Sequence, residues 1–517
     1  METVPAAVAR AAHDYGREPA LVDPYQRRWN FAELHDDVTT VARALIASGI
    51  APGDRVALWA PNTARWVLAA LGVACAGATL VPINTRFTGG EAAGIIRRSH
   101  AKGLIVTGPF LGIDRLASLP AGTLPPFVLP LPHWDAFLGR AAAVPVATAS
   151  ARASAVRPDD LADILFTSGT TGVSKGVMSA HRQSLGVARA WAGIAGLSVR
   201  DRYLVINPFF HSFGLKAGIL ACLTSGATIV PQAVFDVPRT FDLIEHEHVT
   251  VLPGPPTLYL GLLGHQSRIG RSLGSLRLAV TGAAAVPPVL VERIRDELGF
   301  ATVLTAYGLT EAVVATMCRP GDDTRTVACT SGRAAAGFEV RIAEKDGEVL
   351  LRGPNLMLGY LDDPDATASA VDPDGWLHTG DVGRLDEHGN LTITDRLKDM
   401  YVCGGFNVYP AEVERVIAGL PGVAEVAVVG VPDERLGEIG RAYVVPRPGH
   451  EPDPDAVIAF CRERLAGYKA PRSVELRSEL PHNASGKVLK YLLREPTAPA
   501  LPHRTPGPEG RSGGGPA

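Results

Sequence analysis

A run of small and hydroxylic residues around one lysine is the segment best suited to chemistry, residues 166–176 (FTSGTTGVSKG). It follows an apolar run, 161–166, that is typical of a buried strand. Small residues let backbone N–H groups approach an anion, hydroxyl groups add donors, and Lys175 adds a positive charge. The run therefore predicts a phosphate-binding loop. It is not a Walker A loop, in which the lysine follows a glycine, because here Lys175 precedes Gly176.

Two later motifs place a carboxylate where a nucleotide site could use it. YGLTE at 307–311 puts Thr310 beside Glu311, and this pair suits a phosphate oxygen and a hard cation such as Mg²⁺. WLHTGD at 376–381 places Asp381 after a tight Thr-Gly turn, where a carboxylate can accept two hydrogen bonds from a ribose diol. Each motif is weak by itself, so their meaning depends on the other motifs in the chain.

Three further motifs lie closer to the C-terminus: DRLKD at 395–399, CGGFNVYP at 403–410 and PHNASGK at 481–487. The last is rich in turn-forming residues and ends in Lys487, just before the helix-like run 488–494. A lysine displayed on a mobile loop of this kind can enter and leave an active site.

Taken in order, these motifs and GAA at 282–284 resemble the adenylate-forming superfamily, which includes acyl-CoA synthetases, the adenylation domains of peptide synthetases and firefly luciferase. The resemblance covers nearly the whole chain, and seven ordered motifs are not expected by chance. It implies attack of a carboxylate on the α-phosphate of ATP, giving acyl-AMP and pyrophosphate, and then acyl transfer to coenzyme A. The wording of LKDMYVCGGFNVYPAEVE and FFHSFGLKAGI is most similar to actinobacterial fatty-acyl-CoA ligases, near a branch that activates propanoate side chains on the steroid C/D-ring remnant.

The resemblance also implies which residues hold ATP and Mg²⁺. The β- and γ-phosphates would be bound by Thr167, Ser168, Gly169, Thr170, Thr171, Gly172 and Lys175. The adenine side of the pocket would be lined by Gly282, Ala283, Ala284, Tyr307 and Gly308. The α-phosphate would be touched by Thr310, the Mg²⁺ ion held by Glu311, and the ribose bound by Asp381 and Arg396.

Lys487 would be the adenylation lysine, bridging the carboxylate and the α-phosphate while charge moves to pyrophosphate. Lys398 would lie at a hinge between a large and a small domain. Gly404 and Gly405 would lie along the pantetheine tunnel after the small domain rotates. Because coenzyme A brings its own thiol, the reaction requires no catalytic cysteine, Ser–His pair or metal triad.

His211, in NPFFHSFG, matches the histidine or aromatic gate at the acyl pocket of this family. The candidate pocket residues are Phe210, His211, Gly254, Gly282 and Tyr307. Small residues at Gly254 and Gly282 would leave room for a wide ring system, which favours a bulky alicyclic, steroid-derived or terpenoid acid over a plain fatty acid. Lys216 follows the gate within an apolar stretch and is expected to face solvent from a helix. The alternative for Lys216 is a contact with the acyl substrate or with the pocket entrance.

Two positions depart from the family pattern. Ser174 stands where the phosphate loop commonly has Pro, and Ala336 stands where Pro often precedes Gly337. Because proline mainly restricts the entropy of a loop, both changes are expected to be mild.

The elements that must position these residues alternate between strands and helices. Short apolar runs at 55–59, 103–107 and 227–230 suit buried parallel strands, and 31–48 has helical spacing. Residues 118–158, rich in Pro and Ala, are expected to be a surface connection. The pattern predicts an α/β fold with a large N-terminal domain of layered subdomains at 1–394.

A second, smaller α+β unit is predicted at 400–494, mobile about a hinge at 395–399. Helices are expected at 410–418, where Pro stands in the first turn, and at 455–465, with strands at 423–431 and 442–445. The Pro- and Gly-rich segment 495–517 cannot build a core and is expected to be a disordered tail.

Composition narrows the classes of partner and location. The 517-residue chain has a net charge of −3, which disfavours nucleic acid, and only eight of its 50 basic residues are lysine. Its six cysteines form no CxxC pair and no metal-ligand spacing with histidine. The first residues lack the apolar core of a signal peptide, so a cytoplasmic protein is predicted. The apolar run 66–83 is broken by Gly72, Gly77 and Pro82, which favours a buried helix and a strand over a membrane span.

Two alternatives stay open at this level. One is an acyl-AMP ligase that loads a carrier protein, and the other is a homologue that runs only one half-reaction. The CoA-ligase reading implies ATP, Mg²⁺ and coenzyme A as cofactors and a small-molecule carboxylic acid as the partner. A homodimer is one option for the assembly.

Overall fold

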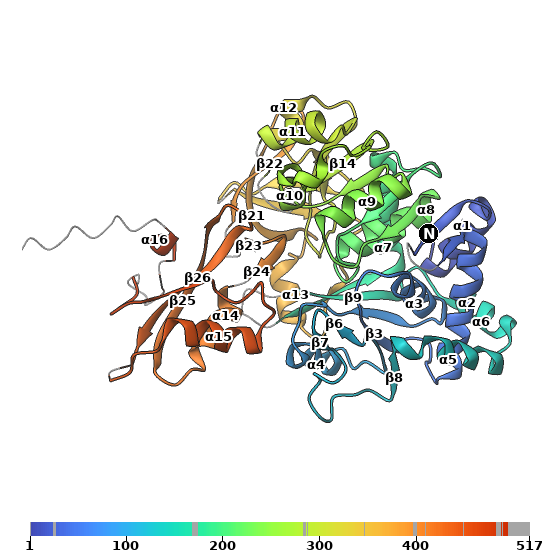
Figure 1. The fold of residues 1–517 in the computed structure, drawn as a ribbon, viewed down its shortest axis with the longest axis horizontal. Coiled ribbons are helices and arrows are strands. Elements are labelled where there is room, and N and C mark those ends of the chain that lie inside the picture. The colour runs from blue at the N-terminus through green and yellow to red at the C-terminus, as the bar shows by residue number, and fades with distance from the viewer. Residues whose placement is uncertain are drawn as a thin grey trace, which may run out of the picture.

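We describe the chain from a computed structural model, which covers residues 2–23, 27–167, 174–282, 286, 288–345, 347–396, 401–408, 410–447, 449–481, 488 and 490–494. Helices surround two large sheets, and the orange-to-red C-terminal unit lies at one end of the molecule (Figure 1). The many parallel strands with helical crossovers confirm the α/β class predicted from the sequence.

The larger sheet has nine strands in the order β17-β16-β15-β14-β13-β11-β12-β1-β2. They are β1 (Pro19–Val22), β2 (Arg28–Asn30), β11 (Arg202–Val205), β12 (Thr228–Pro231), β13 (Val251–Pro253), β14 (Leu278–Gly282), β15 (Thr302–Tyr307), β16 (Thr316–Met317) and β17 (Arg333–Ala334). Neighbours between β1 and β15 run parallel, while β2 at one edge and the pair β16 and β17 at the other are joined by antiparallel pairing. Since the carboxyl ends of parallel strands meet at one edge of a sheet, the segments after β11, β13, β14 and β15 converge there.

The second large sheet has seven strands in the order β20-β10-β9-β4-β3-β5-β8. They are β3 (Arg55–Trp59), β4 (Thr79–Pro82), β5 (Gly103–Val106), β8 (Phe127–Pro130), β9 (Leu161–Thr167), β10 (Lys175–Ala180) and β20 (Gly359–Tyr360). Strands β9 and β10 form an antiparallel hairpin, while β8, β5, β3, β4 and β9 are parallel. The predicted strands at 55–59, 103–107 and 227–230 are confirmed as β3, β5 and β12.

The helices of the large unit are α1 (Val4–Tyr15), α2 (Phe31–Ala47), α3 (Ala64–Cys75), α4 (Gly89–Arg98), α5 (Trp134–Gly139), α6 (Val146–Ala155), α7 (His181–Ala195), the π-helix η3 (Phe213–Leu220), α8 (Ala221–Ser225), α9 (Val237–Glu247), α10 (Pro256–Gly264), α11 (Pro288–Leu298), α12 (Thr324–Cys329) and α13 (Pro364–Ala370). Helix α2 starts with a capping box between Asn30 and Glu33. Helix α3 is buried on almost all sides and is followed by β4, which confirms the buried helix and strand predicted for 66–83. Within the described segments, no helix has the length and apolarity needed to cross a membrane.

The segment 118–158 is not the surface connection that its composition suggested. It contains the edge strand β8 and the helices α5 and α6, with the short 3₁₀ turns η1 (Leu131–His133) and η2 (Arg140–Ala143). Phe127, Trp134 and Phe137 are buried in the main hydrophobic core. Alanine is the best helix former, so its abundance here favoured helix, and the aromatic side chains fix the segment to the core.

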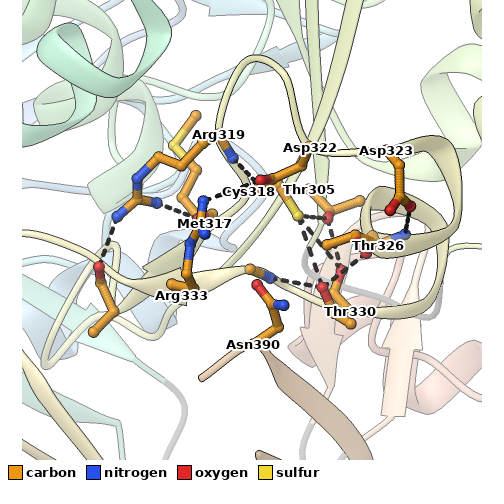
Figure 2. A network of polar contacts seen from close by, with 12 residues as sticks. Thr305, Met317, Cys318, Arg319, Asp322, Asp323, Thr326, Thr330, Arg333 and Asn390 are labelled. Atoms are coloured by element: carbon orange, nitrogen blue, oxygen red, sulfur yellow. Dashed lines mark hydrogen bonds and ion pairs between the residues drawn. The ribbon is translucent and has the colours of Figure 1, made fainter. Parts of the chain in front are cut away.

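A four-stranded antiparallel sheet follows, made of β18 (Glu339–Ile342), β19 (Glu348–Arg352), β21 (Leu377–Leu385) and β22 (Leu391–Arg396). Figure 2 shows the polar network at the adjoining edge of the nine-stranded sheet, where the Thr305 hydroxyl donates to the Thr330 carbonyl oxygen at 2.7 Å. Next to it, the backbone of Leu391 exchanges hydrogen bonds with the segment 331–332. These bonds fix the four-stranded sheet, through β22, to the end of the nine-stranded sheet formed by β15, β16 and β17.

The C-terminal unit has its own sheet of β23 (Tyr401–Cys403), β24 (Phe406–Val408), β25 (Val423–Asp433), β26 (Gly437–Pro446) and β27 (Ser473–Leu476), with α14 (Pro410–Ala418), α15 (Pro454–Arg464) and α16 (Tyr491–Arg494). A separate hydrophobic cluster that includes Val413, Val428 and Val457 joins the helices to the sheet. The predicted helices and strands of this α+β unit are confirmed. The hinge at 395–399 falls largely on 397–400, and the tail at 495–517 wholly, outside the described residues, so both boundaries stay predictions.

Candidate active site

The predicted phosphate loop connects β9 to β10. Lys175, the first residue of β10, pairs directly with Thr167, the last residue of β9. The Lys175 ammonium lies 4.6 Å from the centre of the Tyr360 ring. Five of the predicted loop residues lie outside the described part of the chain: Ser168, Gly169, Thr170, Thr171 and Gly172. The described ends of the hairpin place the lysine beside β20.

The YGLTE motif forms a tight loop directly after β15. The Ala315 N–H donates to the Tyr307 carbonyl oxygen at 2.9 Å and closes the loop. A Cβ at Gly308 would lie 1.8 Å from the Val313 carbonyl oxygen, so this turn requires glycine. Val313 has a φ of 60°, a left-handed conformation that is costly for a β-branched residue. Such strain is typical of a loop that the surrounding structure holds in one functional shape.

Glu311 is held by a residue that the sequence analysis did not identify. The Tyr360 hydroxyl donates to Glu311 Oε1 at 2.7 Å, and the Met357 N–H donates to the Glu311 carbonyl oxygen at 2.8 Å. Burial raises the pKa of the Glu311 carboxyl, while the hydrogen bond from Tyr360 and the charge of Lys175 oppose that rise. An aromatic residue in a Gly-Tyr pair carries no specific chemical signal, so Tyr360 became visible only in the fold.

Tyr307 and Asp381, predicted for the base and the ribose, lie together. The Tyr307 hydroxyl donates to Asp381 Oδ2 at 2.7 Å. Asp381 is 8% exposed and stands directly opposite Arg396 in the β21–β22 pair. The structure therefore brings three predicted nucleotide residues to one place, although only the backbone of Arg396 is described.

The turn before Asp381 is fixed by Glu348, a second residue that the motifs did not reveal. Its carboxylate accepts from the Gly380 N–H at 2.7 Å and lies 2.7 Å from His378 Nδ1. The Thr379 hydroxyl donates to a backbone carbonyl of β19 at 2.7 Å and accepts from the Asp381 N–H at 3.1 Å. These bonds hold the Thr-Gly turn, and with it the carboxylate, in one orientation.

The loop that carries the acyl-gate candidates is held by two amide side chains, the buried Asn62 and the half-buried Asn207. Asn62, 5% exposed, accepts from the Phe209 N–H at 2.8 Å and donates to the Asn207 carbonyl oxygen at 3.0 Å. Asn207 in turn donates to the Pro253 carbonyl oxygen at 3.0 Å. The loop after β11 is therefore tied to the end of β13, which places half-buried Phe210 beside the Gly254 segment. Asn62 is 145 residues from Asn207, and no sequence signal linked them.

His211 is neutral in this setting. Its Nδ1 accepts from the Phe213 N–H at 3.2 Å, so that nitrogen carries no proton. Although solvent reaches the ring, the crowding protein desolvates it and lowers the pKa of His211 to about 4. A neutral imidazole suits the wall of a pocket for an apolar acyl group.

Gly254 and Gly282 do not leave the open space that was expected of them. A Cβ at Gly254 would lie 2.6 Å from Leu258 Cδ1, and one at Gly282 would lie 2.2 Å from the Ala306 carbonyl oxygen. Backbone packing therefore requires glycine at position 282, whereas at Gly254 the nearest atom is the end of the Leu258 side chain, which already fills the space. Their small size is not evidence for a wide ring pocket, and the argument for a bulky acid must come from elsewhere.

The Gly404–Gly405 turn of the C-terminal unit lies against this same segment. Its residues have φ values of 58° and 83°, which favour glycine in a tight hairpin turn between β23 and β24. A Cβ at Gly405 would lie 3.2 Å from Pro255 Cγ, at the start of α10. The turn predicted to line the pantetheine tunnel thus reaches the large unit beside Gly254.

The presence of alanine instead of proline at position 336 is more than the mild change that was expected. Its φ is 53°, in the left-handed region, whereas the proline ring holds φ near −65°. The loop before Gly337 therefore has a backbone conformation that proline cannot adopt. Here alanine in place of proline reflects a different loop shape and is not a simple loss of stiffness.

The remaining predicted residues lie outside the described part of the chain and stay predictions: Ala283, Ala284, Lys398 and Lys487. Thr310 is half-buried next to Glu311 in the loop after β15. The described residues contain no group of three His, Cys, Asp or Glu side chains that could enclose a metal ion. The site thus offers single carboxylates, amides, hydroxyls and one ammonium around the end of β15.

Comparisons with known proteins agree with this geometry. A family model described as AMP-binding enzyme matches residues 8–361, and one described as AMP-binding enzyme C-terminal domain matches residues 412–487. A relative from Rhodococcus jostii, named 3-[(3aS,4S,7aS)-7a-methyl-1,5-dioxo-octahydro-1H-inden-4-yl]propanoyl:CoA ligase, is 57% identical over 508 residues, covering 95% of this chain and 98% of that protein. The relative of the same name from Mycobacterium tuberculosis is also 57% identical, covering 96% of this chain and 99% of that protein.

Solved structures resemble nearly the whole chain, and one of them shows the likeness over both units. It is a double mutant of o-succinylbenzoate CoA synthetase from Bacillus subtilis, bound with its product analogue OSB-NCoA. The TM-score is 0.84 at 29% identity, over 94% of this chain and 97% of that one. Because the match spans both units, the units lie in a similar relative arrangement in the two structures.

Proposed function

The chain belongs to the AMP-binding enzyme family and is an ATP-dependent acyl-CoA ligase, and from this premise we propose which acid it activates and how its residues act. The proposed acid is a propanoate carried on a methylated, dioxo-substituted octahydroindene, as named for both relatives at 57% identity. That identity, which extends over nearly the whole chain, is the observation that carries the proposal.

In the first step the acid carboxylate attacks the α-phosphate of ATP, and the protein acts by positioning and by stabilising charge. Asp381, oriented by Tyr307 and by the Thr-Gly turn, would hold the ribose. Lys175 and the loop that precedes it would bind the outer phosphates, and Lys487 would bridge the carboxylate and the α-phosphate. The gate loop around His211 would present the acid from the neighbouring strand end.

The Mg²⁺ ion of this family would be held by Glu311. Glu311 is half-buried, and its carboxylate accepts a hydrogen bond from Tyr360 and lies within electrostatic reach of Lys175. Mg²⁺ typically binds through one or two carboxylates together with substrate phosphates and water, which fits this single-carboxylate site. When bound, the ion supplies charge neutralisation on the phosphates, and the side chains around it supply the alignment.

In the second step the coenzyme A thiol takes the acyl group, and the C-terminal unit would guide it. The contact of the Gly404–Gly405 turn with Pro255, and the likeness to a synthetase bound with a CoA product analogue, support this use of the present arrangement. Cys403 stands beside the turn but is 2% exposed, and burial raises the pKa of its thiol. Cys403 is therefore not the nucleophile, and the reacting thiol comes from coenzyme A.

A panel of acids scored by pyrophosphate release tests the proposed substrate. The panel contains the bicyclic propanoate, 3-cyclohexylpropanoate, octanoate and hexadecanoate. We expect kcat/KM for the bicyclic acid to exceed that for octanoate by about 100-fold. The reason is that an apolar pocket loses binding free energy for each methylene group of a substrate that does not fit its shape. A linear acid with the highest kcat/KM would overturn the proposed acid.

The acceptor is tested separately with the best acid of that panel. Coenzyme A and a phosphopantetheinylated carrier protein are offered in parallel, and thioester formation is followed by mass spectrometry. We expect transfer to coenzyme A. Preferential loading of the carrier protein would overturn the acceptor while leaving the assigned acid standing.

A further inference from the structure

Lys216 does not face solvent, as its sequence context suggested, but is buried. It lies in the π-helix η3 and is 1% exposed. Its ammonium donates to the Ser179 hydroxyl at 2.8 Å and lies 3.0 Å from Asp163 Oδ1. A charge in such a place must be paired, because an isolated ammonium in a protein interior is costly. The alternative expectation, a contact between Lys216 and the acyl substrate, does not fit this arrangement either, since the ammonium is directed at these protein oxygens.

Both partners of Lys216 belong to the phosphate-loop hairpin. Asp163 lies in β9 and Ser179 in β10, and the two residues stand directly opposite each other in the ladder. The second oxygen of Asp163 accepts from the Ser184 hydroxyl in α7 at 2.7 Å. The carboxylate is thus fixed from two sides. Through it, Lys216 binds the β9–β10 hairpin, whose loop runs from Thr167 to Lys175.

Lys216 itself belongs to the acyl-gate side. The π-helix begins two residues after His211, and the Leu215 N–H donates to the His211 carbonyl oxygen at 3.0 Å. A Cβ at Gly214 would lie 2.2 Å from the Pro208 carbonyl oxygen, so helix and gate loop are packed without a gap. The Tyr203 hydroxyl donates to the Ala217 carbonyl oxygen at 2.9 Å and ties the helix to the nine-stranded sheet. A π-turn in this place is typical of a functional site.

We propose that Lys216 is a positioning residue that fixes the acyl gate relative to the phosphate loop. The ion pair joins the hairpin of the seven-stranded sheet to a helix of the nine-stranded sheet, and the acid and ATP are held one on each side. The distance between the acid carboxylate and the α-phosphate is then set by Lys216 and Asp163. The inference rests on the acyl-pocket role of the 210–211 segment in the proposed function.

A purely structural ion pair is the competing explanation, and a paired set of variants separates the two. Lys216→Met removes the ammonium and leaves Asp163 uncompensated. The double variant Asp163→Asn with Lys216→Met removes both charges and keeps an oxygen that can accept from the Ser184 hydroxyl, so little change in stability is expected. Ser179→Ala is the mild variant, because it removes one hydrogen bond and keeps both charges.

The readouts are the melting temperature and the KM values for acid and for ATP in pyrophosphate release, with the best acid of the panel. For Lys216→Met we expect KM for the acid to rise about tenfold and kcat/KM to fall about 100-fold, as for a misplacement of about 1 Å. KM for ATP should stay within about twofold. The double variant should recover the wild-type melting temperature to within about 3 °C and still keep the raised acid KM.

A double variant with both a recovered melting temperature and a wild-type acid KM would show that the pair is merely structural. Equal changes in the KM for the acid and the KM for ATP would also show that the pair is merely structural. If both lysine variants fail to fold, Ser179→Ala decides, with an acid KM about threefold higher expected and an unchanged acid KM overturning the proposal. Since the acid is chosen from the panel result, a wrong substrate proposal leaves this test intact.

Discussion

Two lysines are buried within the part of the chain that the structure describes, one inside the large unit and one between the units. Lys216 contacts Asp163 and Ser179, which lie in one hairpin. Lys469 is 1% exposed and lies 3.0 Å from Glu91 Oε1 and 2.7 Å from Glu412 Oε1. Glu91 belongs to α4 of the large unit, whereas Glu412 belongs to α14 of the C-terminal unit. A buried, paired lysine thus joins two parts of one unit in the first case and two units in the second, and we propose that only the second pair of parts separates during the reaction.

The two lysines differ in which ionic partners they would lose if their contacts opened. If the C-terminal unit rotates away, Lys469 loses Glu91 but keeps Glu412 on its own unit, so its charge stays compensated. Burial by itself lowers the pKa of Lys469, but Tyr468, Glu91 and Glu412 outweigh it and the pKa is raised, so the ammonium stays charged. Around it, Asn84 donates to the Tyr468 hydroxyl at 3.0 Å. We expect a releasable contact here and a permanent one at Lys216.

The largest expected effect concerns a residue of the C-terminal unit that acts in one step only. Lys487→Ala should slow acyl-AMP formation by ~10²–10³, because one charge-stabilising contact to the transition state is lost. Thioester formation from supplied acyl-AMP and coenzyme A should be largely spared. Single-turnover assays of each half-reaction measure this, and equal losses in both would remove the assigned role.

The interface between the units should affect the opposite step. Glu91→Gln removes the charge facing Lys469 but keeps an acceptor for the capping box of α4, where Gln is also suitable. We expect thioester formation from supplied acyl-AMP to fall about tenfold, which corresponds to about 1.4 kcal/mol. Acyl-AMP formation should change less than about twofold.

Glu339→Gln is the matched control for that variant, because its partner Arg352 is on the surface and Glu339 is 59% exposed. It should leave both half-reactions unchanged. If Glu91→Gln slowed the two half-reactions equally, the distinction between a permanent and a releasable lysine contact would be lost.

A contact within the large unit should act on metal use. Tyr360→Phe removes the donor to Glu311, which leaves this half-buried carboxylate harder to ionise and weakens its hold on Mg²⁺. We expect the Mg²⁺ concentration for half-maximal pyrophosphate release to rise roughly 3–10-fold. Calorimetry of Mg²⁺-dependent ATP binding gives a second readout.

Tyr443→Phe serves as the control for Tyr360→Phe. It also removes a buried tyrosine hydroxyl, which donates to the Leu493 carbonyl oxygen at 2.9 Å in the C-terminal unit. Its Mg²⁺ dependence should match that of the unchanged protein. Matching shifts in both variants would mean that Tyr360 acts through general stability.

The smallest effect is expected at His211. Since surrounding protein lowers the pKa of His211 to about 4, we expect the imidazole to be neutral between pH 6 and 9. His211→Phe should therefore leave the shape of the pH–rate profile for acyl-AMP formation unchanged in this range. If the unchanged protein showed an inflection near pH 6.5 in its pH–rate profile and the variant did not, the expectation that His211 is neutral would be wrong.

Local elements were well predicted because their signals lie close together in the chain. The helix expected at 410–418 begins and ends as Pro410–Ala418, and the strand expected at 55–59 is Arg55–Trp59. Proline in the first turn and a run of buried apolar residues act on immediate neighbours, so the sequence carries the information. The segment 118–158 was missed because its abundant alanine was taken as a sign of a loop, although alanine favours helix.

The candidate site was predicted in its motif residues and missed in the residues that hold them. Thr310, Glu311 and Asp381 were named from short motifs, and the structure brings the motifs together. Tyr360 and Asn62 were not named, because each acts through a hydrogen bond to a partner far away in the chain, 49 residues away for Tyr360. Ordinary Tyr and Asn residues carry no mark of such a role.

The sequence was enough to predict the family and the α/β class, which are both confirmed, and to name the candidate nucleotide-binding residues from ordered motifs. Only the fold shows that Lys216 is buried, that backbone packing requires Gly282, and that Ala336 has a conformation closed to proline. It also decided that Lys469 joins two units across 378 residues of chain. The physical reason is that burial, close approach and charge pairing depend on which distant segments meet, whereas propensity and motif chemistry depend on neighbours along the chain.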